Sequence, residues 1–258
     1  MLGLGTGLVY PTAIDSVIPY ANLASVLFDG GSMYGEIPDS DVLTPLATGS
    51  GFAWSVWVRL PSATSQQRII SKSANSGSTG HEWMLTTDGA SKPRLFIYFN
   101  GTVSGRIRFI IDTGLSANTW YHLAFSWDGV PDNTSSVTGW LDGAIKTHGS
   151  GATLGQLGSG TDTVTNDTTT VKIARAIGNY GNVYVDEVAL FDEELNNTQV
   201  TNIYNSGTPI DLSSHSDLVG YWRMGENDSS PTISDLSGQG NDMTLINSAS
   251  IDTSVYAG

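Results

Sequence analysis

The amino-acid sequence predicts an all-β protein, a two-sheet antiparallel sandwich with one short helix. In the run 120–127, WYHLAFSW, large apolar residues alternate with small or polar ones, which is the period of a half-buried strand. Asp-Gly pairs at 29–30, 88–89, 128–129 and 142–143 suit the positive φ of tight hairpin turns. Closely spaced strands joined by such turns favour a sandwich over a parallel α/β sheet.

The positions of the individual strands are predicted from the same alternation of apolar and polar residues. In 52–60 we expect Phe52, Trp54, Val56 and Val58 on the core face of a strand. A short helix is expected over 194–206, with Asn196 or Asn197 as its cap and Gly207 as its stop, and 149–169 is expected to be a long loop. The expected strands lie near 25–28, 33–37, 52–60, 68–73, 82–87, 94–99, 106–111, 120–127, 136–141, 144–148, 171–175, 181–191 and 218–224.

Composition argues against two classes of partner, nucleic acids and membranes. A net charge of −14 would repel a polyanion, so we expect no nucleic-acid partner. No apolar run approaches the ~20 residues needed to cross a bilayer, so we expect no membrane partner. The chain has no cysteine. Its start lacks the pattern of a secretory signal, which favours synthesis in the cytoplasm.

Five stretches carry a family resemblance, in the order in which that family has them. They are SVLFDGGSMYGEIPDSD, FAWSVWVRL, WYHLAFSWDG with VTGWLDG, NVYVDEVALFDEEL with TQVTNIYNSG, and YWRMGENDSSPTISDLSGQGNDMTL. The chain thus resembles the laminin-G-like, concanavalin A-like lectin–glucanase jelly-roll domains. Its YWRMG segment resembles tails of tailed-phage structural proteins. The resemblance implies an N-terminal arm at 1–22, a jelly-roll domain at 23–215, and a C-terminal segment at 216–258 that packs on the sandwich or on a partner.

The sequence offers no catalytic constellation. Glycoside hydrolysis needs two carboxylates that face each other across a cleft, and the glucanases that the chain resembles carry them as Glu-x-Asp-x-x-Glu along one strand. No such pattern occurs in this chain. We therefore expect a protein that is not an enzyme.

Asp186 is an acidic residue whose predicted apolar environment needs an explanation. In YVDEVALF it shares a strand face with apolar residues, where a carboxylate must be satisfied. It could accept backbone amides, or it could bind calcium, whose natural ligands are oxygen atoms. The resemblance implies a structural calcium where the first strand meets the last, with Asp29 as the second contributor. The alternative for Asp29 is that it only shapes its turn with Gly30.

Two functions remain in view, both of them binding functions. The first is a virion structural or decoration protein on a phage capsid or tail surface. Its partners would be other virion proteins or a second copy of the chain, and its assembly contacts Leu4, Val9, Tyr10, Tyr221 and Trp222. The second is a lectin-like module at a cell surface or in secreted form. In either setting a host surface glycan could stack on tryptophans that lie off the clearest core faces, namely Trp57, Trp83 and Trp140.

Overall fold

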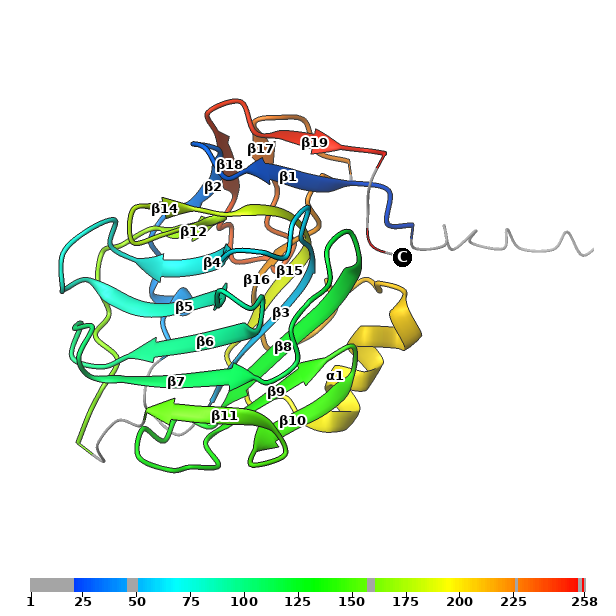
Figure 1. Ribbon diagram of the computed structural model, residues 1–258. Coiled ribbons are helices and arrows are strands. Elements are labelled where there is room, and N and C mark those ends of the chain that lie inside the picture. The colour runs from blue at the N-terminus through cyan, green and yellow to red at the C-terminus, as the bar shows by residue number, and fades with distance from the viewer. Residues whose placement is uncertain (1–20, 46–50, 157–160, 226, 255–256, 258) are drawn as a thin grey trace, which may run out of the picture.

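The computed structural model describes residues 21–45, 51–156, 161–225, 227–254 and 257, and it shows a two-sheet antiparallel sandwich (Figure 1). The all-β prediction, with one short helix, is confirmed. Hydrogen bonds between two short parallel strands, β10 and β11, join the sheets along one edge. No helix in the described part of the chain is long and apolar enough to span a membrane.

The first sheet, sheet A, is built around the long strand β15, which pairs with β3 along one side and with β1 and then β16 along the other. From β3 the sheet continues through β8 and β9 to β10, and β19 pairs with the free side of β1. Its strands are β1 (Ser25–Asp29), β3 (Phe52–Arg59), β8 (Trp120–Trp127), β9 (Val137–Leu141), β10 (Ala144–His148), β15 (Asn182–Phe191), β16 (Leu218–Trp222) and β19 (Ser250–Asp252).

The second sheet, sheet B, runs in the order β17-β18-β2-β12-β4-β5-β6-β7-β11. Its strands are β2 (Tyr34–Ile37), β4 (Arg68–Ser73), β5 (His81–Thr87), β6 (Pro93–Tyr98), β7 (Arg106–Ile111), β11 (Gly151–Gln156), β12 (Val171–Ile173), β17 (Thr232–Ile233) and β18 (Met243–Ile246). A small hairpin of β13 (Arg175–Ala176) and β14 (Asn179–Tyr180) lies beside β4, and a single 3-10 turn, η1 (Asp41–Leu43), follows β2.

The main core lies between the two sheets, and the expected face of β3 points into it. Phe52, Trp54, Val56 and Val58 are all buried there. Trp54 meets Trp83 of the opposite sheet edge to face, with ring centres 5.7 Å apart. The alternation of strand residues therefore identified the core side of β3 correctly.

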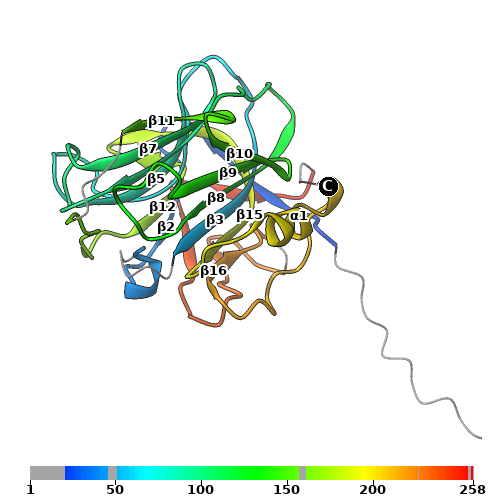
Figure 2. The ribbon, with the colours of Figure 1, turned by 90° about the horizontal axis from the view of Figure 1, so that it is seen from below.

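A second apolar cluster lies on the other face of sheet A, beneath the helix α1 (Asn197–Tyr204) and the segment that follows it. Asn196 caps the helix by accepting from Thr198 and Gln199, as the sequence predicts. The helix ends at Asn205, which adopts the left-handed conformation, and not at the predicted stop Gly207. A 3-10 turn, η2 (Asn205–Gly207), follows. Figure 2 shows α1 and β16 on this side, away from β5, β7 and β12 of sheet B.

The C-terminal segment supplies strands to both sheets, since β16 pairs with β15, β18 with β2, and β19 with β1. Tyr221 and Trp222 are buried in the two apolar clusters, and the Trp222 indole donates to the carbonyl of Asn241. The prediction that these two rings need a partner subunit for burial is therefore wrong. The other predicted assembly contacts, Leu4, Val9 and Tyr10, lie outside the described residues.

Five strands of the described chain were not expected: β11, β14, β17, β18 and β19. Residues 149–169 were predicted to be a loop, but β11 forms within them and pairs with β7 at the edge of sheet B. Its sequence, GATLGQ, lacks the alternation of large apolar residues that marks the other strands.

Candidate functional site

Asp186 is buried and is satisfied by hydrogen bonds. Its Oδ2 accepts from the side-chain amide of Asn22 at 2.9 Å and from the backbone amide of Ala257 at 3.0 Å, and its Oδ1 accepts from the amide of Glu187. Burial raises the pKa of Asp186 well above its usual range, the charge of Glu187 raises it further, and these hydrogen bonds act in the opposite direction. Asp186 thus fastens residues near both ends of the described chain.

Asp29 belongs to a different place. It is exposed and accepts the amide of Gly31 at 2.8 Å, a contact that lowers its pKa. Because Asp29 pairs with Asn182, four residues before Asp186, the two acids are separated by about 13 Å along the strand. The structure therefore does not bring together the two residues of the predicted calcium site, and calcium binding stays a prediction. The three groups directed at Asp186 are N–H donors, which do not suit a cation.

The three tryptophans predicted to stack on sugars are buried, so that prediction is also wrong. Trp57 lies beneath Tyr204 of α1, with ring centres 5.8 Å apart. Trp140 lies beneath the same helix and donates to Asn197 at 3.0 Å, whereas Trp83 points into the main core and donates to the carbonyl of Leu43. Trp57 and Trp140 do lie off the main core face, but α1 covers them.

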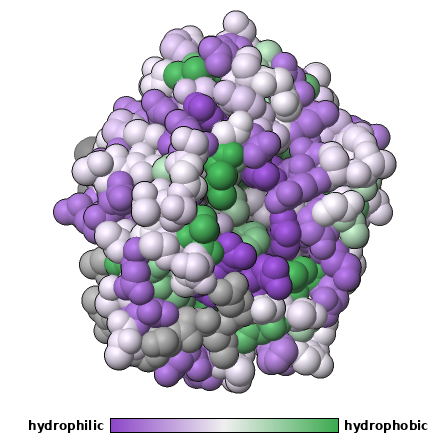
Figure 3. Space-filling view, turned by 60° about the vertical axis from the view of Figure 1, so that its left-hand side comes forward, coloured by the Kyte–Doolittle hydropathy of each residue, from purple (hydrophilic) through white to green (hydrophobic). Residues whose placement is uncertain are grey.

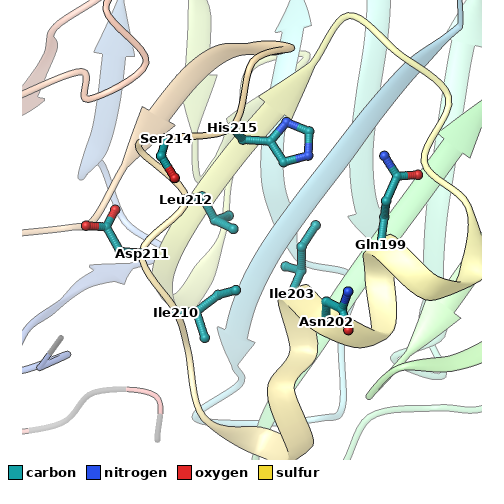
Figure 4. Close-up of a pocket in the computed structure, with 8 residues that line it drawn as sticks. All are labelled: Gln199, Asn202, Ile203, Ile210, Asp211, Leu212, Ser214 and His215. Carbon is teal, nitrogen blue, oxygen red and sulfur yellow. The ribbon is translucent and has the colours of Figure 1, made fainter. Parts of the chain in front are cut away.

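A pocket of about 310 Å³ lies between α1 and the segment 210–215 (Figure 4). The side chain of Gln199 in its lining is engaged within the protein, since it donates to Glu193 and accepts from Asn196 as part of the helix cap. The pocket is at the small end of the range for ligand sites. We interpret it as the seam between the helix and this segment. Its lining is Gln199, Asn202, Ile203, Ile210, Asp211, Leu212, Ser214 and His215.

Beside this pocket, metal-ligating atoms of Glu193, His215 and Asp217 lie within 4.8 Å of one another. His215 lies 3.6 Å from Glu193 and 3.9 Å from Asp217. Burial raises the pKa of Glu193, as does Asp217, while His215 lowers it. Pairing of the histidine with the two acids accounts for the arrangement, and we assign no ion to it.

The outer face of sheet B carries a different group, which sequence reasoning missed. Leu95, Ile97, Ile107 and Phe109 point into the core, so alternation directs their neighbours on β6 and β7 outward. We call the resulting set the arginine face: Arg68 of β4, Arg94 of β6, and Arg106 and Arg108 of β7, around the buried rings of Phe96 and Tyr98. The signal in the sequence was an arginine at alternate positions of RIRFII.

Aromatic rings support these guanidinium groups from below. The guanidinium carbons of Arg94 and Arg106 lie 5.2 and 5.5 Å from the centre of the Phe96 ring, within cation–π range. Phe96 in turn stacks on Tyr98 at 6.0 Å, and Arg108 is the direct cross-strand neighbour of Phe96. Figure 3, in which the left-hand side of Figure 1 is turned toward the viewer, shows hydrophobic groups among hydrophilic ones on this side of the molecule.

Hydrogen-bonding capacity is left unused on the arginine face. The Nε atoms of Arg94, Arg106 and Arg108 are buried and have no hydrogen-bond partner in the described structure. Arg94 and Arg106 each donate one bond to a backbone carbonyl, of Thr87 and Val103. A guanidinium carries five N–H donors and the four arginines are partly exposed, so their terminal amino groups, and not the buried Nε atoms, are the donors available to a ligand.

Comparison with known proteins agrees with the architecture. Residues 29–201 match the model of the concanavalin A-like lectin/glucanases superfamily, well over half of the chain. No curated protein sequence matches the chain at a significant level.

Two solved structures illustrate the likeness. A proposed carbohydrate-binding protein from Bacteroides ovatus is similar with a TM-score of 0.63 and 14% identity, over 92% of this chain and 62% of that one, so the chain spans less than two thirds of that protein. A native heptameric SAP-like pentraxin from Limulus polyphemus is similar with a TM-score of 0.48 and 14% identity, over 71% of this chain and 82% of that one. At such identities the likeness shows the fold alone. The chain belongs to the concanavalin A-like lectin/glucanase superfamily.

Proposed function

We propose that this chain is a carbohydrate-binding module without catalytic activity, and that it holds a glycan on the outer face of sheet B. The observation that carries the proposal is the difference between the two outer faces. The outer face of sheet A is covered by α1 and the segment 208–217. In the described part of the chain no helix covers the outer face of sheet B. Ala176 and Ile177 of the β13–β14 hairpin and Val103 pack on Phe96 and Tyr98, and the four arginines around these rings stay partly exposed.

The chemistry of this face suits sugars. Glycans present many oxygen atoms that accept hydrogen bonds, and guanidinium groups offer several donors in a fixed plane. Cation–π contacts with Phe96 hold two of these planes in place, so less side-chain freedom is lost when a ligand binds. The superfamily includes lectins, and the structural likeness to a proposed carbohydrate-binding protein supports the same class.

The virion setting predicted from the sequence stays a prediction. Its arm residues lie outside the described part, and Tyr221 and Trp222 are buried within the chain. A glycan-binding module would serve as well on a virion as on a cell surface. Mass spectrometry of purified phage particles would test the setting separately from the binding activity.

The binding activity is tested on an array of neutral and acidic glycans. The comparison uses the wild-type chain, the double variant R94A/R108A and the control R59A. Arg59 is a matched control because it also stacks on a ring, that of Tyr184 at 4.9 Å, but belongs to sheet A. The proposal expects glycan binding that R94A/R108A weakens and R59A does not. Absence of binding to every glycan, or binding that R94A/R108A leaves intact, would overturn it.

A further inference from the structure

We infer that the arginine face selects acidic glycans, and that a carboxylate or sulfate group of the sugar sits among Arg94, Arg106 and Arg108. This inference rests on the proposed function and deepens it by naming the ligand class. The distribution of charge, the geometry and the electrostatics of the face each support it.

The distribution of charge is uneven. The chain carries only 11 lysine and arginine residues against 25 acids, yet four of those 11 form the arginine face. The ion pairs of the described residues involve Lys72, His215 and Arg223, and none of them involves this face. The arginine face thus has no ion pair with a carboxylate among the described residues, although arginine is usually paired when its charge is desolvated.

The geometry brings the cations together. Arg94 on β6 and Arg106 on β7 approach the same Phe96 ring from two adjacent strands. Arg108 extends across Gly155 of β11, where an added Cβ would lie 2.5 Å from its Nε. Planar guanidinium groups held in this way present fixed pairs of donors, the arrangement that binds carboxylate and sulfate oxygens well.

The electrostatics of the face favour an anion over a neutral sugar. Burial lowers the pKa of Arg94, and the charges of Arg68 and Arg108 lower it further, against the effect of Asp88. A bound oxyanion would relieve this repulsion among the arginines, whereas a neutral hydroxyl would not. The net charge of −14 weakens the binding of every polyanion, so the ligand class is defined by its acidic group, a carboxylate or sulfate on a sugar, and a nucleic acid serves as the control.

The test uses pairs of polysaccharides that differ in charge alone, measured by affinity gel electrophoresis of the whole chain. Polygalacturonate is compared with its methyl-esterified form for carboxylate, and dextran sulfate with dextran for sulfate. Single-stranded DNA is the phosphate control. We expect retardation by at least one acidic member and not by its neutral partner, with weakening at high salt. R94A and R108A should each weaken binding about tenfold, and R59A should leave it unchanged.

The conservative variant R108K separates charge from geometry. It keeps the positive charge but loses the planar pair of donors, so we expect affinity between that of the wild type and that of R108A. Circular dichroism and the melting temperature of each variant confirm that it is folded.

The outcomes are distinct. Equal binding of the neutral and acidic members would overturn the choice of an acidic ligand and leave the carbohydrate-binding function standing. Binding of no polysaccharide would overturn both. Retardation by DNA that equals or exceeds that by the acidic sugars would assign the face to phosphate polyanions instead. Acidic-sugar binding that R94A and R108A both retain would place the site elsewhere.

Discussion

Lys72 and Glu82 form an ion pair inside the molecule: Nζ and Oε1 lie 3.1 Å apart, and neither side chain is exposed to solvent. Lys72 also contacts Asp39 at 2.9 Å and donates to Thr44 at 2.6 Å, while Glu82 accepts the amide of Asp167. Burial raises the pKa of Glu82, and the positive charge of Lys72 acts against that shift. This network fastens two loops to β4 and β5 at one end of sheet B.

Removal of one partner should leave a buried charge uncompensated. We expect K72M to reduce the free energy of unfolding by about 3–5 kcal/mol in urea unfolding. E82Q should reduce it less, because Lys72 stays paired with Asp39. The double variant K72M/E82L should recover much of this loss. The partly exposed Lys146 gives the control K146M, which should change stability by less than about 0.5 kcal/mol. A loss below about 1 kcal/mol for K72M would show that water reaches the pair.

Strand alternation predicted much of the fold because it reports burial on two faces, but it cannot show what covers a strand from outside. The core face of β3 and the capped helix were predicted correctly. Trp57 and Trp140 were placed off the main core correctly, yet the layer formed by α1 buries them. The arginine face escaped prediction because it depends on the pairing of β6 with β7, and no single strand reveals its neighbour.

His122 should make stability depend on pH. Its ring is buried, forms a hydrogen bond with Ser55 at 2.8 Å, and packs against the rings of both Trp57 and Tyr204. Burial lowers the pKa of His122 from 6.5 to about 3. Between these values the unfolded chain binds the proton and the folded chain does not, so the free energy of unfolding falls as pH is lowered through this window.

Protonation of His122 lowers the free energy of unfolding by at most about 1.4 kcal/mol for each pH unit in this window. Urea unfolding across the window should therefore show a shallower loss of stability in H122Q than in the wild type, while H148Q, which changes an exposed histidine, should behave like the wild type. Equal slopes for H122Q and the wild type would show that His122 takes up its proton in the folded state.

The hydrogen bonds of Asp186 predict how the protein responds to calcium. Because Asn22, Glu187 and Ala257 direct N–H groups at this carboxylate, we expect the same melting temperature with calcium and with chelator. D186A should lower the free energy of unfolding by about 1–3 kcal/mol, since it leaves these donors unsatisfied. A melting temperature that rises with calcium in the wild type but not in D186N would establish the calcium site that the sequence suggested.

The most direct test of the central claim is a titration of ¹⁵N-labelled protein with oligogalacturonate and, separately, with sulfated dextran oligosaccharides, followed through the arginine Nε–H signals in NMR spectra. The account predicts that the signals of Arg94, Arg106 and Arg108 shift in a saturable manner while that of Arg59 does not. Shifts confined to backbone amides of α1 and the segment 210–215, or no shift at any concentration, would contradict it.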